Sequence, residues 1–177
     1  MTVFEAIEAR YSHKEKFLPN PVPLADLEKI ARAGLTAPSG NNLQTVRLII
    51  LPDRKSLDPL CEIVSHQALA TTPAAIALFT DGSLTAEGHT SFDMENYSAA
   101  MENILLAATA MGYSSLWLDY PYFDAGRQAA SKKLLGLPEA CRLWATIPIG
   151  KPDGEGSRRA KLPLESRLFL RQYGQQL

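Results

Sequence analysis

The chain has 177 residues, of which 46% are hydrophobic and 21% are charged, and its formal net charge at pH 7 is −1. This length and balance are typical of one globular domain with a sizeable core. Proteins that bind nucleic acid or anionic membranes carry a broad basic excess, so the small net charge argues against both classes and any phosphate site must be local.

Cysteine usage and the amino terminus favour the cytoplasm. Cys61 and Cys141 lie far apart in apolar contexts without C-x-x-C spacing, so neither a structural disulfide nor a thiolate metal cluster is expected. Residues 1–10 include acidic side chains and do not resemble a secretory signal. The apolar runs 74–79 and 104–111 are far shorter than the roughly 20 residues of a membrane span.

Apolar periodicity predicts an alternation of helices and strands along the chain. In order, we expect helix 2–9, helix 24–34, strand 46–51, helix 56–64, strand 74–79, helix 93–111, strand 114–119, helix 124–135 and strand 142–149. His66 and Gln67 are expected in a loop, and Thr80–Ser91 reads as a mobile surface segment. This alternation alone would suggest a parallel doubly wound sheet.

The helix over residues 93–111 has the strongest pattern. Its apolar residues recur at spacings of three and four, and alanines and leucines fill the other faces. A helix that is apolar nearly all round must be covered on more than one side. It is therefore either a central core helix or one shared with a second subunit.

Residues 37–46 have the composition of a binding loop between a helix and a strand. Pro38 restricts the backbone, Gly40 permits positive φ, and Ser39, Asn42 and their neighbours offer several donors and acceptors. The same residues are also common at an ordinary helix end followed by a turn.

Basic residues gather near both ends of the chain. Arg10, Ser12 and Lys14 could grip an anion, or they could form a solvated helix end. Residues 151–177 contain six basic and three acidic side chains, a net charge of +3, which leaves −4 on the rest. A basic tail on an acidic body is compatible with an anion site and equally with a solvated tail.

Common catalytic templates are absent from the sequence. It lacks G-x-S-x-G, H-E-x-x-H, a P-loop and G-x-G-x-x-G, and His13, His66 and His89 are scattered without metal-ligand spacing. We therefore expect no metal site, and chemistry carried by a bound organic cofactor would explain polar loops and cations without an obvious nucleophile or base.

Five motifs in order resemble the FMN-dependent nitroreductase family. They are Arg10-Tyr11-Ser12-His13-Lys14, residues 37–44, the alanine-rich helix that ends at Gly112, Ile147-Pro148-Ile149-Gly150-Lys151-Pro152 and Lys161-Leu162-Pro163-Leu164-Glu165. Each motif is loose by itself, but together they cover almost the whole chain.

The resemblance implies an α+β fold, a nitroreductase-like three-layer α/β/α sandwich with a central, mainly antiparallel sheet. Residues 1–177 would form a single FMN-binding domain, and residues 151–177 would be an extension that packs on the partner subunit. The protein would be a homodimer with two FMN molecules in its interface, each held by both subunits.

The resemblance also assigns FMN-binding residues. Arg10, Ser12, Lys161 and the adjacent Arg159 would neutralise the phosphate, with Tyr11 in the same motif, and Lys14 would lie near the pyrimidine edge of the flavin.

A second group would approach the flavin ring. Pro38, Ser39 and Gly40 would come from the other subunit and Asn42 would bond the ring edge. The strand end Trp117-Leu118-Asp119 would pass the isoalloxazine.

Three positions depart from the family pattern. Tyr11 stands where Arg or His is common, Thr45-Val46 replaces a Pro-Trp pair, and Gln67 falls near the sequence position where some members have a second lysine by the ring.

The activity that the resemblance implies is hydride transfer from NADH or NADPH through flavin N5 to a planar acceptor, such as a nitroaromatic or quinone, without a catalytic side chain. Alternatives are dehalogenation, enoate reduction, and flavin binding without turnover.

Overall fold

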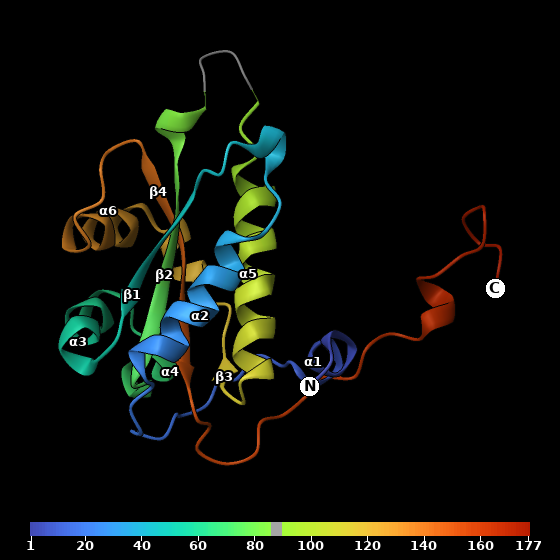
Figure 1. Ribbon diagram of the computed structural model, residues 1–177, viewed down its shortest axis with the longest axis horizontal. Helices are drawn as coiled ribbons and strands as arrows, with labels where there is room; N and C mark the ends of the chain where they lie inside the picture. Colours follow the sequence, from blue (N-terminus) through green and yellow to red (C-terminus); the bar gives the residue numbers. More distant parts are fainter. Residues whose placement is uncertain (86–89) are drawn as a thin grey trace.

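The computed structural model describes residues 1–85 and 90–177, with helices arranged around one sheet (Figure 1). The helices are α1 (Val3–Ala9), α2 (Leu24–Leu35), α3 (Arg54–Ile63), α4 (Gln67–Thr71), α5 (Asp93–Ala110) and α6 (Ala125–Leu134). The strands are β1 (Val46–Leu51), β2 (Ala74–Asp81), β3 (Ser114–Ser115) and β4 (Cys141–Gly150). Single 3-10 turns are η1 (Gly40–Asn42), η2 (Gly82–Leu84), η3 (Tyr120–Phe123) and η4 (Leu164–Ser166).

The sheet is antiparallel throughout. Its strand order is β1-β2-β4-β3, and Ala77 in the middle of β2 lies opposite Ile49 of β1 and Thr146 of β4. The parallel doubly wound sheet suggested by the alternation of elements is therefore wrong, and the antiparallel sheet is confirmed. Apolar periodicity specifies which segments are strands but carries no information about their direction.

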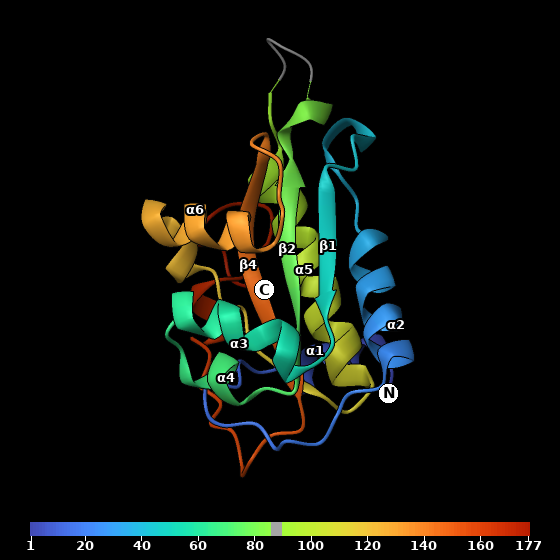
Figure 2. The ribbon, with the colours of Figure 1, turned by 90° about the vertical axis from the view of Figure 1, so that its left-hand side faces the viewer.

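Alternate side chains of β2 supply two separate cores. Ala74, Ile76 and Leu78 belong to a core that includes residues of α2 and α5. Ala75, Ala77 and Phe79 belong to a second core with residues of α3 and α4. Because successive side chains of a strand point to opposite faces, this division places helices on both sides of the sheet. Figure 1 shows α3 and α6 on one side of the sheet and α2 and α5 on the other, and Figure 2 shows α3, α4 and α6 in front of the sheet with α5 behind it.

Helix α5 is the central helix of its layer. Its buried residues face the sheet and α2, and Gly34 of α2 lies so close that an added Cβ would meet Cγ1 of Ile104 at 2.6 Å. The other side of α5 remains partly open, because Ala99 and Leu106 are only half-buried and Met94 is exposed. The expected helix 93–111 is thus confirmed to within one residue.

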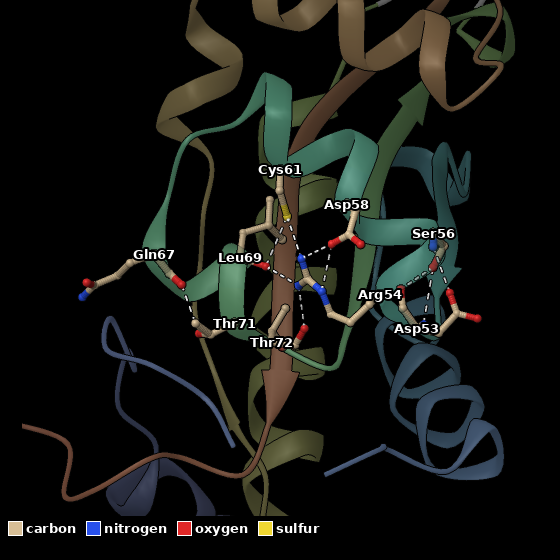
Figure 3. A network of polar contacts seen from close by, with 9 residues as sticks. All are labelled: Asp53, Arg54, Ser56, Asp58, Cys61, Gln67, Leu69, Thr71 and Thr72. Carbon is tan, nitrogen blue, oxygen red and sulfur yellow. Dashed lines mark hydrogen bonds and ion pairs between the residues drawn. The ribbon is translucent and has the colours of Figure 1, made fainter. Parts of the chain in front are cut away.

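The segment after α3 differs from the expected loop, because residues 67–71 form α4. His66 caps this helix, since its Nδ1 accepts a hydrogen bond from the backbone N–H of Ala68. Arg54 then ties α3 to α4 by donating hydrogen bonds of 2.9 Å to the carbonyls of Leu69 and Thr72 (Figure 3). A helix of five residues is too short to have a clear apolar period, so tertiary hydrogen bonds decide its conformation.

Strand β3 is also shorter than expected. The predicted strand 114–119 pairs with β4 only through Ser114 and Ser115, followed by an isolated bridge between Leu118 and Thr146. Between these points Trp117 turns its ring edge-on against Tyr97, and its indole N–H donates to Asp119. Side-chain packing thus interrupts a ladder that β-propensity alone would have continued.

The carboxyl-terminal segment, residues 151–177, leaves the body beside β4 and leads past α1 into open space (Figure 1). Nearly all of it is exposed, including several large apolar side chains, namely Leu162, Leu164, Leu168, Leu170 and Tyr173.

Helix η2 (Gly82–Leu84) occupies part of the predicted surface segment 80–91, but residues 86–89, with His89, lie outside the described residues. Within the described ranges, no helix combines the length and apolar character that crossing a bilayer requires.

Candidate functional site

Residues 10–14 run in extended form from the end of α1 along the edge of the sheet. Ser12 forms a parallel bridge with Ser115, and the backbone N–H of His13 donates to the Ser115 carbonyl at 3.0 Å. Exposure alternates along the segment, with Ser12 and Lys14 exposed and His13 buried. Pairing with β3 therefore presents the polar side chains on one side of an ordered backbone.

Arg10 is held by an acid of α5. Its Nε lies 3.3 Å from Oε1 of Glu102, without the alignment of a hydrogen bond, so this buried N–H has no hydrogen-bond partner among the described residues. The ion pair orients the guanidinium beside the cavity described next. A guanidinium that is held in place beside a cavity is well suited to bind an anionic ligand.

A cavity of about 700 Å³ joins the two basic clusters. Its charged lining residues are the cations Arg10, Lys14, Arg158, Arg159 and Lys161 and the acids Glu8 and Glu15, a net charge of +3. Tyr11, Ser12 and His13 complete the same wall. The amino-terminal and tail residues that the sequence proposed for a phosphate thus lie around one cavity, although about 150 residues separate them in the chain.

The loop of residues 37–44 is fastened to the start of α5. Buried Asn96 accepts a hydrogen bond from the Gly40 N–H at 2.8 Å and donates one to the Thr45 hydroxyl at 3.0 Å. Asn41, Asn42 and Gln44 have positive φ angles of 51°, 54° and 51°, which asparagine tolerates better than most residues. Thr45, one of the departures from the family pattern, thus has a structural partner.

The loop lines a second, smaller cavity rather than the cationic one. This cavity of about 310 Å³ includes Pro38, Ser39 and Arg47, together with Asn96 of α5, whereas the Asn42 side chain is exposed. Figures 1 and 2 place the loop at the amino-terminal end of α5 and α1 near the other end. Within one chain the loop and the basic cluster therefore do not meet.

The remaining predicted site residues line neither cavity. Trp117 donates its indole N–H to Asp119 at 3.0 Å and packs against Tyr97, which is half of a stacked pair with Trp144. Leu118 is buried in the core between α3, α4 and the sheet. These residues follow β3, in which Ser115 pairs with Ser12.

Lys14 has a polar neighbourhood of its own. Gln67 donates hydrogen bonds of 3.0 Å to the Lys14 carbonyl and to the Glu15 carboxylate. Partial burial, and secondarily the charge of Lys14, lower the pKa of His66 below its ordinary value. Gln67 thus supports the backbone of Lys14 at the position where the sequence comparison noted the absence of a second lysine.

Sequence reasoning missed three contributors to the cationic cavity. Glu102 is one of many polar residues in a helix pattern, Arg158 contributes to the sequence pattern only as a tail charge, and His13 has a place in the family motif but no assigned role. His13 is buried, its Nε2 donates a hydrogen bond of 2.8 Å to the Lys16 carbonyl, and its Nδ1 has no partner in the described part of the chain. Since a carbonyl only accepts, Nε2 carries the proton. The sequence feature that could have assigned Arg158 to this cavity is its position next to Arg159.

Comparison with known proteins places this architecture in a family. The pattern described as "Nitroreductase family" matches residues 7–79 and 62–151. A protein of Archaeoglobus fulgidus, provisionally named NADH dehydrogenase/NAD(P)H nitroreductase, is 36% identical over 132 residues, which cover 73% of this chain and 74% of the relative.

Solved structures agree with the sequence match. One, provisionally named NADH dehydrogenase/NAD(P)H nitroreductase, from Parabacteroides distasonis, has a TM-score of 0.81 at 30% identity and covers 97% of this chain and 98% of its own. Another, a provisionally named nitroreductase in complex with FMN from Desulfovibrio desulfuricans, has a TM-score of 0.79 at 26% identity and covers 98% of both chains. Both structural matches extend over nearly the whole chain, the two matched ranges of the family pattern together cover residues 7–151, and the chain belongs to the nitroreductase family.

Proposed function

We propose that this protein is an FMN-dependent oxidoreductase that uses NADH or NADPH to reduce a planar acceptor such as a nitroaromatic or a quinone. The observation that carries the proposal is the cavity in which Arg10, Ser12, Arg159 and Lys161 converge. Family membership supports the assignment, and the FMN complex of a relative that is 26% identical supports the choice of flavin.

The donor set fits a flavin phosphate. A phosphate monoester carries a charge of nearly −2 at neutral pH and accepts several hydrogen bonds, and the cavity lining has a net charge of +3. The guanidinium of Arg10, oriented by Glu102, and the exposed hydroxyl of Ser12 are donors suited to it. We assign Arg10, Ser12, Arg159 and Lys161 to phosphate binding.

Bound FMN would supply the redox chemistry, accepting electrons from the nicotinamide and passing them to the acceptor. Lys14 lies beyond Ser12 on the same extended segment, and a cation at the pyrimidine edge favours the reduced, negatively charged ring. No side chain needs to act as an acid or base. Trp117, Leu118 and Asp119 would form the wall beside the ring, because their segment continues from the strand that pairs with Ser12.

The flavin site would be completed by a second copy of the chain. Pro38, Ser39, Gly40 and Asn42 belong to a loop distant from the cationic cavity, so they would reach the flavin of the partner rather than their own. The exposed apolar tail and the open side of α5 support a homodimer in which the segment 151–177 packs on the partner through its exposed part beyond Lys161. The whole chain would then act as one domain in each subunit. Both cysteines are free thiols, in keeping with the cytoplasm.

Anaerobic reduction tests the proposed activity. We expect the purified protein to be yellow and to lose its flavin absorbance when NADH or NADPH is added, with recovery when a nitroaromatic or a quinone follows. A bound flavin that stays oxidised would contradict the reductase assignment and indicate a flavin-binding protein without turnover. Bleaching without recovery by either acceptor would point to dehalogenation or enoate reduction instead.

A further inference from the structure

The tail touches the body at two places before it leaves. Near its start, the Leu18 N–H donates to the Lys151 carbonyl at 2.9 Å, and the Asp153 N–H donates to the Lys16 carbonyl at 2.9 Å. The second place is residues 156–158. Beyond Arg158, every hydrogen bond found for the tail in the described residues is internal to the tail.

Tyr11 provides the surface on which the tail rests at this second place. A Cβ added to Gly156 would lie 1.9 Å from Cε2 and 2.5 Å from Cζ of the Tyr11 ring, so only a residue without a side chain fits there. The hydroxyl of Tyr11 lies 3.1 Å from the hydroxyl of Ser114, which fixes the ring against β3. The tyrosine that replaces a family cation therefore contacts the tail directly.

Arg158 completes the contact from the tail side. Its Nη1 donates to the Glu8 carbonyl at 2.9 Å and its Nη2 donates to the Ala9 carbonyl, and these carbonyls lie at the carboxyl end of α1. The last carbonyls of a helix lack intrahelical partners, and a cation there is favourable. The guanidinium carbon also lies 5.6 Å from the centre of the Tyr11 ring.

We infer that Tyr11, Gly156 and Arg158 form a tail lock, a set of positioning residues that sets the affinity for the flavin phosphate. The inference rests on the proposed function, because FMN is the ligand. With Arg158 held, Lys161 is three residues from a fixed point and can range over about 10 Å. With Asp153 as the last fixed point, Lys161 would be eight residues away along the chain and could range over about 28 Å. The lock thus confines Arg159 and Lys161 to the cavity before FMN binds.

Comparison of FMN with riboflavin isolates this effect, because riboflavin has the same ring and ribityl chain without the phosphate. The full-length protein, freed of flavin, is titrated with each compound and the flavin fluorescence is followed. For Tyr11→Ala, which changes no charge in the cavity, we expect the Kd for FMN to rise about tenfold while the Kd for riboflavin stays within about twofold. Phe123→Ala, at an exposed aromatic ring of η3 that lines neither cavity, is the control and should change neither Kd.

Two further variants separate positioning from direct contact. Arg158→Lys keeps the charge but loses the two-pronged bond to α1, so it should weaken FMN binding selectively if Arg158 acts through the lock. Gly156→Ala should also weaken FMN binding selectively, because the added methyl group conflicts with the Tyr11 ring. In the Tyr11→Ala background, however, Gly156→Ala should add no further loss, because the ring that it meets is gone.

The outcomes distinguish the lock from the proposed function itself. A wild-type protein that binds FMN no more tightly than riboflavin would overturn the phosphate site. If wild type prefers FMN, but Tyr11→Ala and Gly156→Ala weaken both flavins equally or neither, the tail lock is wrong. Additive losses in the double variant would also contradict it. An unchanged Kd for riboflavin shows that the part of the site that binds the flavin ring is still folded in each variant.

Discussion

At the scale of single residues, close approach decides the form of the loop of residues 37–44. The Asn96 side chain holds the Gly40 N–H, and the Phe92 ring covers Gly40 so closely that an added Cβ would meet Cδ2 at 2.2 Å. Gly40 is therefore required for its small size, not for its φ. The sequence suggested a glycine needed for a turn, and neither of its two partners could be identified without the tertiary structure.

Gly40→Ala should displace the loop and lower stability. We expect a loss of about 1–3 kcal/mol in the free energy of unfolding, because the methyl group overlaps a packed aromatic ring. Urea denaturation measures it. The double variant Gly40→Ala/Phe92→Ala should lose no more than Phe92→Ala alone, since the conflict is removed. If the double variant lost as much stability as the two single variants together, the Phe92 ring would not be what the added methyl group meets.

At the scale of elements, one side-chain bond joins α2 to the chain that follows α5. The Tyr113 hydroxyl donates to Oδ2 of Asp26 in the first turn of α2. Desolvation, together with the hydrogen bond and the negative charge of Asp26, raises the pKa of Tyr113 to about 12. The neutral phenol is thus favoured in the folded protein.

This bond predicts an alkaline loss of stability. Because the folded pKa of about 12 lies above the ordinary value of 10.0, the contribution of Tyr113 is complete below pH 10.0 and decreases as the pH rises towards 12. The free energy of unfolding, measured with urea, should fall less between pH 7 and about pH 11 for Tyr113→Phe than for wild type. Tyr173→Phe, at an exposed tyrosine, should behave as wild type. If the free energy of unfolding fell equally with pH in all three proteins, Tyr113 would not be the cause of the alkaline loss of stability.

At the scale of the whole molecule, the two groups of residues proposed for the FMN site lie at different ends of α5. The cations proposed for the phosphate line one cavity, and the loop with the proposed ring contacts lines the other. Only an arrangement of two chains in which each loop approaches the cavity of the other would join them. The exposed leucines of the tail are the natural surface for such an association.

Removal of residues 162–177 should therefore abolish the dimer while leaving Arg159 and Lys161 in place. We expect the full chain to have about twice its chain mass of 19.4 kDa by light scattering, and the shortened chain to have the monomer mass. Circular dichroism would show whether the helices remain. A full-length protein that is monomeric, or a shortened protein that stays dimeric, would contradict the role of the tail.

The sequence alone determined most elements, because helical and strand periods are local properties of the chain. The bounds of β1 were predicted to the residue, and β2, β4 and α5 within two. Strand direction, the shortened β3 and the helix α4 were decided by the tertiary structure, since they depend on pairing and on side chains such as Trp117 and Arg54. Residue types alone left both basic clusters open to a solvated role, and only the family resemblance implied a phosphate site built from both ends of the chain. The meeting of Tyr11 with Gly156, and of Arg158 with the end of α1, came only from the fold, because steric fit between distant segments has no signature in one sequence.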